Sequence, residues 1–185
     1  MFNLQYHKYY KLGLCQNYMA DTILQTAEDL QIVPLTKQLA LHQAESILAL
    51  EHNWTEIGDE PWNLENLIYE LPGKWELSHI ALNHEDIVGY QIGSIREGHA
   101  FLNKIIVDRE KRVKSAGRGL LRAFLNKSLE KGLARVRFRV RVDNPAVGFY
   151  EKLGFVPKGE LDYSRKDGVA SYFYDTRIMD VIQRV

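Results

Sequence analysis

The sequence predicts an α/β fold in which one mixed sheet is covered by helices on both faces. Strand-like runs come first as a meander and then alternate with helical patterns, which indicates such a sheet. The chain has 185 residues and is 45% hydrophobic, enough for one substantial core. No linker, repeat or low-complexity tract divides it. We therefore expect one domain over residues 29–185, preceded by an N-terminal extension over residues 1–28.

The first half of the chain contains two helices and a meander. Residues 30–36 read as a short strand, and apolar residues then recur at helical spacing over 36–54, with Thr36 as a candidate N-cap. A shorter helix is expected over 62–71, ended by Pro72-Gly73. Three strand-like runs follow and predict an antiparallel meander: residues 74–82, 86–95 and 99–107.

The second half alternates helices with strands. A helix is expected from Gly119 to Lys131, with Gly132 as its C-cap. The remaining expected elements are a strand over 135–142, a helix over 145–153, a strand from Phe155 and a last strand over 170–178.

One strand carries an unusual pattern, RVRFRVRVDN, in which arginines alternate with apolar residues. Side chains alternate across a strand, so Arg135, Arg137, Arg139 and Arg141 share one face, while the other face holds Val136, Phe138, Val140 and Val142. An unpaired ion costs several kcal/mol, as an order of magnitude, to bury. The arginine face should therefore meet water, carboxylates or an anionic ligand.

Charge and composition exclude several classes of function. Lys+Arg and Asp+Glu are 24 each, so we expect neither nucleic acid nor an anionic membrane as a partner. The single cysteine, Cys15, rules out an intrachain disulfide, and no run of about 18 apolar residues occurs. The six histidines show no metal spacing. These features predict a cytoplasmic protein without a metal.

The loop DREKRVKSAGRG joins a strand to a helix and is the first candidate binding site. Gly117 and Gly119 lie at the helix N-terminus, where unpaired amides and the helix dipole favour a phosphate or pyrophosphate. The alternative is a tight turn that merely opens the helix. The loop matches neither the Walker nor the dinucleotide fingerprint. Its neighbouring cations are Arg109, Lys111, Arg112, Lys114 and Arg118.

Residues 30–180 resemble the GNAT superfamily of acyl-CoA-dependent N-acetyltransferases. The strand end IIV before KSAGRG, the helix LLRAFLNKSLEKG and the stretch DNPAVGFYEKLGF carry the resemblance through their order and spacing. It implies the GNAT fold, a mixed and mostly antiparallel sheet of about six or seven strands. It also implies acetyl-CoA as co-substrate and direct attack of a primary amine on the thioester.

The resemblance also implies roles for matched positions. Tyr150 would protonate the departing CoA thiolate, and Asn144 would bind the pantetheine region, although family spacing points to Asp143 instead. The backbone of Ile105, Ile106 and Val107 would hold the pantetheine arm and the thioester carbonyl. The cofactor's pyrophosphate would lie against the amides of Ser115, Ala116, Gly117, Arg118, Gly119 and Leu120, with Arg112 and Lys114 beside them.

The acceptor and the base stay open. The chain faintly resembles bacterial ribosomal-protein N-terminal-alanine acetyltransferases, but Arg139 or Phe138 stands where those enzymes have a glutamate. We therefore prefer a small-molecule amine as the acceptor over a protein N-terminus or a lysine. The rival function is a non-catalytic GNAT module that binds CoA. The sequence is also compatible with a homodimer. Candidate bases are Glu76, His79, Glu97 and His99.

Two interpretations of the arginine face also stay open. The arginines either pair with carboxylates such as Glu45 or Glu51, or Arg139 or Arg141 binds an anionic group on the acceptor.

Overall fold

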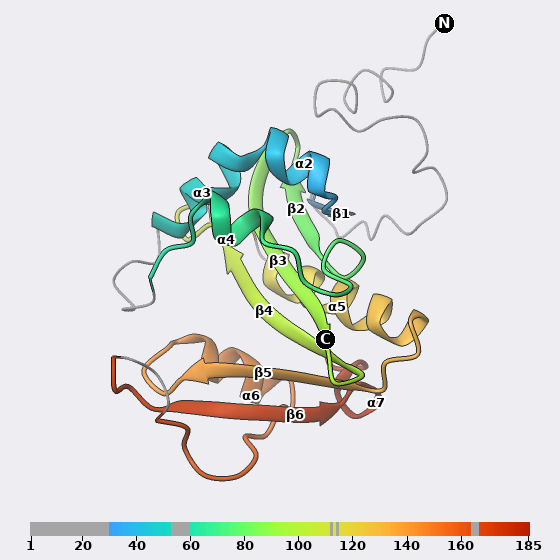
Figure 1. Cartoon of the computed structure of the whole chain (residues 1–185), viewed down its shortest axis with the longest axis vertical. Helices are drawn as coiled ribbons and strands as arrows, with labels where there is room; N and C mark the ends of the chain where they lie inside the picture. The colour runs from blue at the N-terminus through green and yellow to red at the C-terminus, as the bar shows by residue number, and fades with distance from the viewer. Residues whose placement is uncertain (1–29, 53–59, 112, 114, 164–166) are drawn as a thin grey trace, which may run out of the picture.

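The computed structural model shows one six-stranded sheet whose strands follow chain order (Figure 1). It describes residues 30–52, 60–111, 113, 115–163 and 167–185. All neighbouring strands are antiparallel except β4 and β5, which are parallel. The strands are β1 Leu30–Pro34, β2 His79–Asn83, β3 Asp86–Arg96, β4 His99–Val107, β5 Arg135–Arg141 and β6 Ser171–Arg177. The predicted mixed, mostly antiparallel sheet is confirmed, as is the meander of β2, β3 and β4.

Helices cover the sheet on both faces, as predicted (Figure 1). One face is covered over its first strands by α2 Lys37–His42, α3 Ala44–His52 and α4 Leu64–Ile68. The other face packs against α5 Ala116–Glu130, α6 Ala146–Lys152 and α7 Ile178–Val181. No helix in the described part of the chain is long and apolar enough to span a membrane.

Local signals at the helix ends are confirmed. The hydroxyl of Thr36 accepts a hydrogen bond from the Leu39 amide at 3.1 Å, which caps α2. Gly132 follows α5 with a φ of +75°, the left-handed conformation that ends a helix. The expected single helix over 36–54 is instead broken at Gln43 into α2 and α3.

Two predicted strands differ from the structure. The strand predicted over 74–82 begins only at His79, as β2, and residues 74–76 form a turn, because Lys74 is buried and donates to the carbonyls of Leu67 and Tyr69, both at 2.7 Å, at the end of α4. The expected strand from Phe155 is reduced to two isolated bridges, Pro157 with Tyr174 and Asp162 with Ser171. Residues 155–163 thus run along the β6 edge.

The parallel pair β4 and β5 positions the site. The two strands are paired only at Ala100 with Val136 and at Phe101 with Arg137. Beyond this point β4 continues to Val107 paired with β3 alone, and β5 continues to Arg141 paired with β6 alone. The sheet therefore opens into a wedge between its two halves.

Candidate active site

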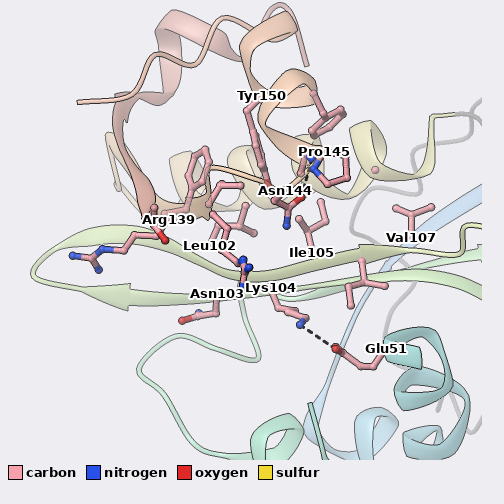
Figure 2. A pocket seen from close by; sticks show the side chains of 18 residues that line it. Glu51, Leu102, Asn103, Lys104, Ile105, Val107, Arg139, Asn144, Pro145 and Tyr150 are labelled. Carbon is pink, nitrogen blue, oxygen red and sulfur yellow. Dashed lines mark hydrogen bonds and ion pairs between the residues drawn. The ribbon is translucent and has the colours of Figure 1, made fainter. Parts of the chain in front are cut away.

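A cleft of about 420 Å³ lies where β4 and β5 diverge. β4 and β5 line it together with α6 and the beginning of α5 (Figure 2). The structure brings eight of the residues singled out from the sequence to this cleft: Ile105, Ile106, Val107, Gly117, Arg139, Arg141, Asn144 and Tyr150.

A β-bulge shapes the β4 wall of the cleft. Ile92 pairs with Lys104 and the next residue, Gly93, pairs with Leu102, so Asn103 is the extra residue. Bulges of this kind re-aim side chains beside active sites. A Cβ on Gly93 would lie 2.6 Å from Phe124 Cε2 and 2.8 Å from the Leu77 carbonyl oxygen, so only glycine fits opposite the bulge.

The beginning of α5 presents backbone amides. Ser115 takes a left-handed φ of 72° and makes no side-chain cap, and the first amides of any α-helix have no intrahelical acceptor. Gly117 lines the cleft, whereas Gly119 packs against Ile32, whose Cγ1 would lie 3.1 Å from an added Cβ.

The other predicted pyrophosphate residues divide into two groups. Ala116 and Leu120 are buried and Arg118 is exposed. The Ala116 amide donates to the Val113 carbonyl at 3.3 Å and the Gly119 amide to the Ser115 carbonyl at 2.7 Å, so the amides of Gly117 and Arg118 are the best placed of this set to bind an anion. Arg112 and Lys114 lie outside the described residues.

Tyr150 lies in an aromatic cluster beneath α6. Its ring is 4.5 Å from that of Phe138 and 5.8 Å from that of Phe155, centroid to centroid. Burial, with a smaller contribution from Tyr174, raises the pKa of the Tyr150 hydroxyl above its ordinary value. The phenol therefore stays protonated at neutral pH, which is the form that can donate a proton into the cleft.

Asn144 lies on the cleft, whereas Asp143 is not among the described lining residues. The Oδ1 atom of Asn144 accepts a hydrogen bond from the Ala146 amide at 2.8 Å, which fixes the side chain at the start of α6. Asp143 instead pairs with Arg141 at 2.7 Å. Of the two candidates left open by the spacing, only Asn144 is thus placed to contact a ligand in the cleft.

The arginines of β5 are paired with carboxylates, but not with Glu45 or Glu51. Asp175 of β6 contacts Arg135 at 2.5 Å and Arg137 at 3.3 Å. The expected helix partners are wrong: Glu51 of α3 pairs with Lys104 of β4 instead.

 

No helix of the described chain covers the arginine face of β5: α2, α3 and α4 lie over the first strands of the sheet (Figure 1). The carboxylates that pair with these arginines therefore come from β6 and the neighbouring loops. Arg141 is buried and contacts both Asp143 at 2.7 Å and Asp167 at 2.8 Å. Arg139 contacts Asp162 at 2.7 Å, and its side chain is 53% exposed at the cleft. Arg139 is thus the more accessible of the two candidate anion binders.

Glu51 is the carboxylate in the cleft that the sequence interpretation did not assign to catalysis. It is 2% exposed and accepts hydrogen bonds from the Tyr90 hydroxyl and, at 3.1 Å, from the Trp62 amide. Lys104 Nζ lies 3.0 Å from its Oε2 atom (Figure 2). The helical spacing of the sequence could have indicated that Glu51 is buried, because it follows Ile47 by four residues and so lies on the buried face of α3.

None of the four base candidates from the sequence lies among the described residues that line the cleft. Glu76 pairs with Lys131, and Glu97, which is 83% exposed, pairs with Arg137. His79 is buried 3.2 Å from Gln91, and burial lowers its pKa to about 4. His99 begins β4, opposite Arg96. No group of three or more metal-binding side chains occurs among the residues that the structure describes.

Comparisons with solved structures agree with this fold. The Ard1 protein of Thermoplasma volcanium is 25% identical, with a TM-score of 0.68 over 80% of this chain and 97% of its own. The ribosomal-protein-S18-alanine N-acetyltransferase of Escherichia coli is 20% identical, with a TM-score of 0.65 over 80% and 94%. PaiA N-acetyltransferase of Thermoplasma acidophilum, solved with coenzyme A, is 18% identical, with a TM-score of 0.60 over 80% and 98%.

A sequence search of curated proteins found no match. The model of the acetyltransferase (GNAT) family, however, matches residues 43–155, which include β4, the α5 start, β5 and the Tyr150 helix. This chain belongs to the GNAT acetyltransferase family.

Proposed function

We propose that this protein transfers an acetyl group from acetyl-CoA to a primary amine by direct attack of the amine on the thioester. The observation that carries the proposal is the cleft, which joins a stretch of β4 that β5 does not pair, the Gly117 end of α5 and a buried tyrosine. These are the three features that thioester binding, pyrophosphate binding and leaving-group protonation require.

The β4 edge and the α5 start would hold the cofactor. From Leu102 to Val107, β4 has no β5 partner, so its backbone groups can pair with the amides of a pantetheine arm. A backbone N–H at Ile105 or Ile106 would stabilise the oxyanion of the tetrahedral intermediate. The first-turn amides of α5 would bind the pyrophosphate, and Asn144 would contact the arm from the α6 side.

Tyr150 would act as the general acid. Its hydroxyl belongs to a residue that is 3% exposed but lines the cleft, and its raised pKa keeps the proton in place until a thiolate forms. A positioned general acid contributes a factor of roughly 100 to 10,000 in rate.

Glu51 would accept the proton of the incoming ammonium, directly or through one water. An amine attacks only when it is neutral, so some group must take this proton. Of the described residues that line the cleft, Glu51 alone carries a carboxylate. The Tyr90 hydroxyl, the Trp62 amide and Lys104 hold that carboxylate in place.

The preferred acceptor is a small-molecule amine that carries an anionic group. Arg139, rather than a carboxylate, stands on β5 at the cleft, and its side chain is half exposed there. Its planar guanidinium suits a carboxylate or a phosphate. A protein N-terminus or a lysine side chain would be the acceptor if no small amine is used.

The test measures release of free CoA from acetyl-CoA against a panel of amines and peptide N-termini. We expect turnover of at least one amine, and Tyr150→Phe should lower kcat by a factor of roughly 100 to 10,000 while the KM for acetyl-CoA changes little. Tyr163→Phe is the matched control, because Tyr163 is 65% exposed and is not among the described cleft residues.

Two results would contradict the proposal. Binding of acetyl-CoA without turnover of any amine would favour the non-catalytic CoA-binding module. A Tyr150→Phe variant as fast as the Tyr163→Phe control would overturn the general-acid role.

A further inference from the structure

We infer that Lys104 is an acetylation site of this protein: in the absence of an external amine, the cleft transfers the acetyl group to Lys104 Nζ of the same chain. The inference rests on the proposed function, because the donor is acetyl-CoA bound in the same cleft. It goes beyond that function, in which Lys104 only holds the Glu51 carboxylate in place, because it makes Lys104 itself a site of covalent modification.

The first observation is the identity of the amine. Of the described residues that line the cleft, Lys104 alone carries a primary amine. Its side chain is 16% exposed, so the ammonium lies within the cleft rather than in bulk solvent. Lys37, at 51% exposure, lies on the outer surface, and the buried Lys74 is not among the described residues that line the cleft.

The second observation is the position of Lys104 on β4, directly after the bulge and directly before Ile105. The amide nitrogen of Ile105 lies about 2.5 Å from the Lys104 Cα by covalent geometry. A thioester carbonyl bound to that amide would lie within roughly 6 Å of this Cα, because a hydrogen bond adds about 3 Å. An extended lysine side chain also spans about 6 Å, so rotation about its side-chain bonds can bring Nζ to the carbonyl carbon.

The third observation is the proton acceptor beside the amine. Lys104 Nζ lies 3.0 Å from Glu51 Oε2 and 5.6 Å from the centre of the Trp62 ring. Proton transfer to Glu51 removes both charges of the ion pair at once. The neutral amine then has no ion pair to hold it on the Glu51 side of β4 and is free to turn toward the thioester.

The chemical step balances without another reactant. Glu51 takes one proton from the ammonium, Nζ forms a bond to the acetyl carbon, and the carbon–sulfur bond breaks. Tyr150 protonates the CoA thiolate, and the second proton lost by nitrogen restores the Tyr150 hydroxyl. Glu51 gives its proton to water, and the products are Nζ-acetyllysine and free CoA.

The experiment incubates the full chain with acetyl-CoA and no added amine, and follows intact mass and peptide maps over time. We expect one acetyl group per chain at Lys104, with a first-order rate constant that does not change when the protein concentration is varied tenfold. Lys104→Arg keeps the charge opposite Glu51 but should remain unmodified. Lys37→Arg should be acetylated at Lys104 like the unmutated protein.

The outcomes separate this inference from the proposed function. Binding of acetyl-CoA, measured by calorimetry, without acetylation of Lys104 would overturn the inference alone. Acetylation spread over surface lysines at similar rates would also overturn it, because that pattern indicates uncatalysed chemistry. Absence of acetyl-CoA binding would instead overturn the proposed function, on which the inference depends.

Discussion

Buried His79 should make the stability of this fold depend on pH. The imidazole of His79 is 6% exposed, and its Nδ1 atom lies 3.2 Å from Gln91 Oε1. Burial lowers its pKa from 6.5 to about 4, and the charge of Lys127 lowers it further, while Gln91 and Glu130 oppose the shift. Between these two pKa values the unfolded chain binds a proton that the folded protein does not bind. Stability is therefore lost as the pH falls below about 6.5.

The size of the loss follows from the shift. One pKa unit corresponds to about 1.4 kcal/mol, so the shift of His79 should lower the free energy of unfolding by about 2.5 kcal/mol between pH 7 and pH 4.5. Urea denaturation followed by tryptophan fluorescence measures this free energy at each pH. Carboxylates that pair with arginines also lose their contribution in acid, so the comparison must be made with a variant.

His79→Asn is that variant, because its side-chain amide can donate where Nδ1 lies but does not titrate. It should lose about 2.5 kcal/mol less than the unmutated protein over the same pH range. His84→Asn, a change at an exposed turn residue with a φ of +54°, should keep the full dependence on pH. Parallel stability curves for His79→Asn and the unmutated protein would refute the reasoning.

Three further substitutions concern the cleft, the sheet beside it and α6. Arg139→Ala should raise the KM of an anionic acceptor by roughly tenfold or more, because one charge-assisted hydrogen bond is lost, and should leave the KM of acetyl-CoA nearly unchanged. Equal effects on the two KM values in steady-state kinetics would argue against acceptor binding by Arg139. Gly93→Ala should lower the free energy of unfolding by roughly 1–3 kcal/mol, because the new Cβ would lie 2.6 Å from Phe124 and 2.8 Å from Leu77. Gly148→Ala, in α6 with no atom within 4 Å of its Cβ position, should instead raise it by up to about 1 kcal/mol in the same urea measurement.

The elements predicted best are those with local signals. The strand over residues 99–107 has the same bounds in the structure, and the Thr36 cap and the Gly132 helix end depend only on adjacent backbone. The run over 74–78 was mistaken for a strand because the partners of Lys74 are carbonyls on α4, five to seven residues earlier. A strand-like pattern does not reveal such a contact.

The cleft itself depends on contacts far apart in the sequence. Motif spacing placed Ile105, Gly117 and Tyr150 together, but the wedge exists because β4 and β5 are paired at only two positions. Pairing of that kind is a property of the assembled sheet. Glu51 was missed for the same reason, since its partner Tyr90 lies 39 residues away and a lone acid on a helix is usually solvated.

The carboxylates beside the arginine face of β5 neutralise its arginines unequally. Burial disfavours the Asp175 carboxylate, but the hydrogen bond from Arg135 and the charges of Arg135 and Arg137 outweigh it, so the pKa of Asp175 lies below its ordinary value. One buried carboxylate thereby serves the two arginines farthest from the cleft. Arg139, the next along the strand, pairs with the more exposed Asp162, lies 5.2 Å from the centre of the Phe173 ring, and stays half exposed at the cleft. A ligand anion could therefore bind Arg139 by displacing one loop carboxylate, whereas binding to Arg135 or Arg137 would break a buried pair.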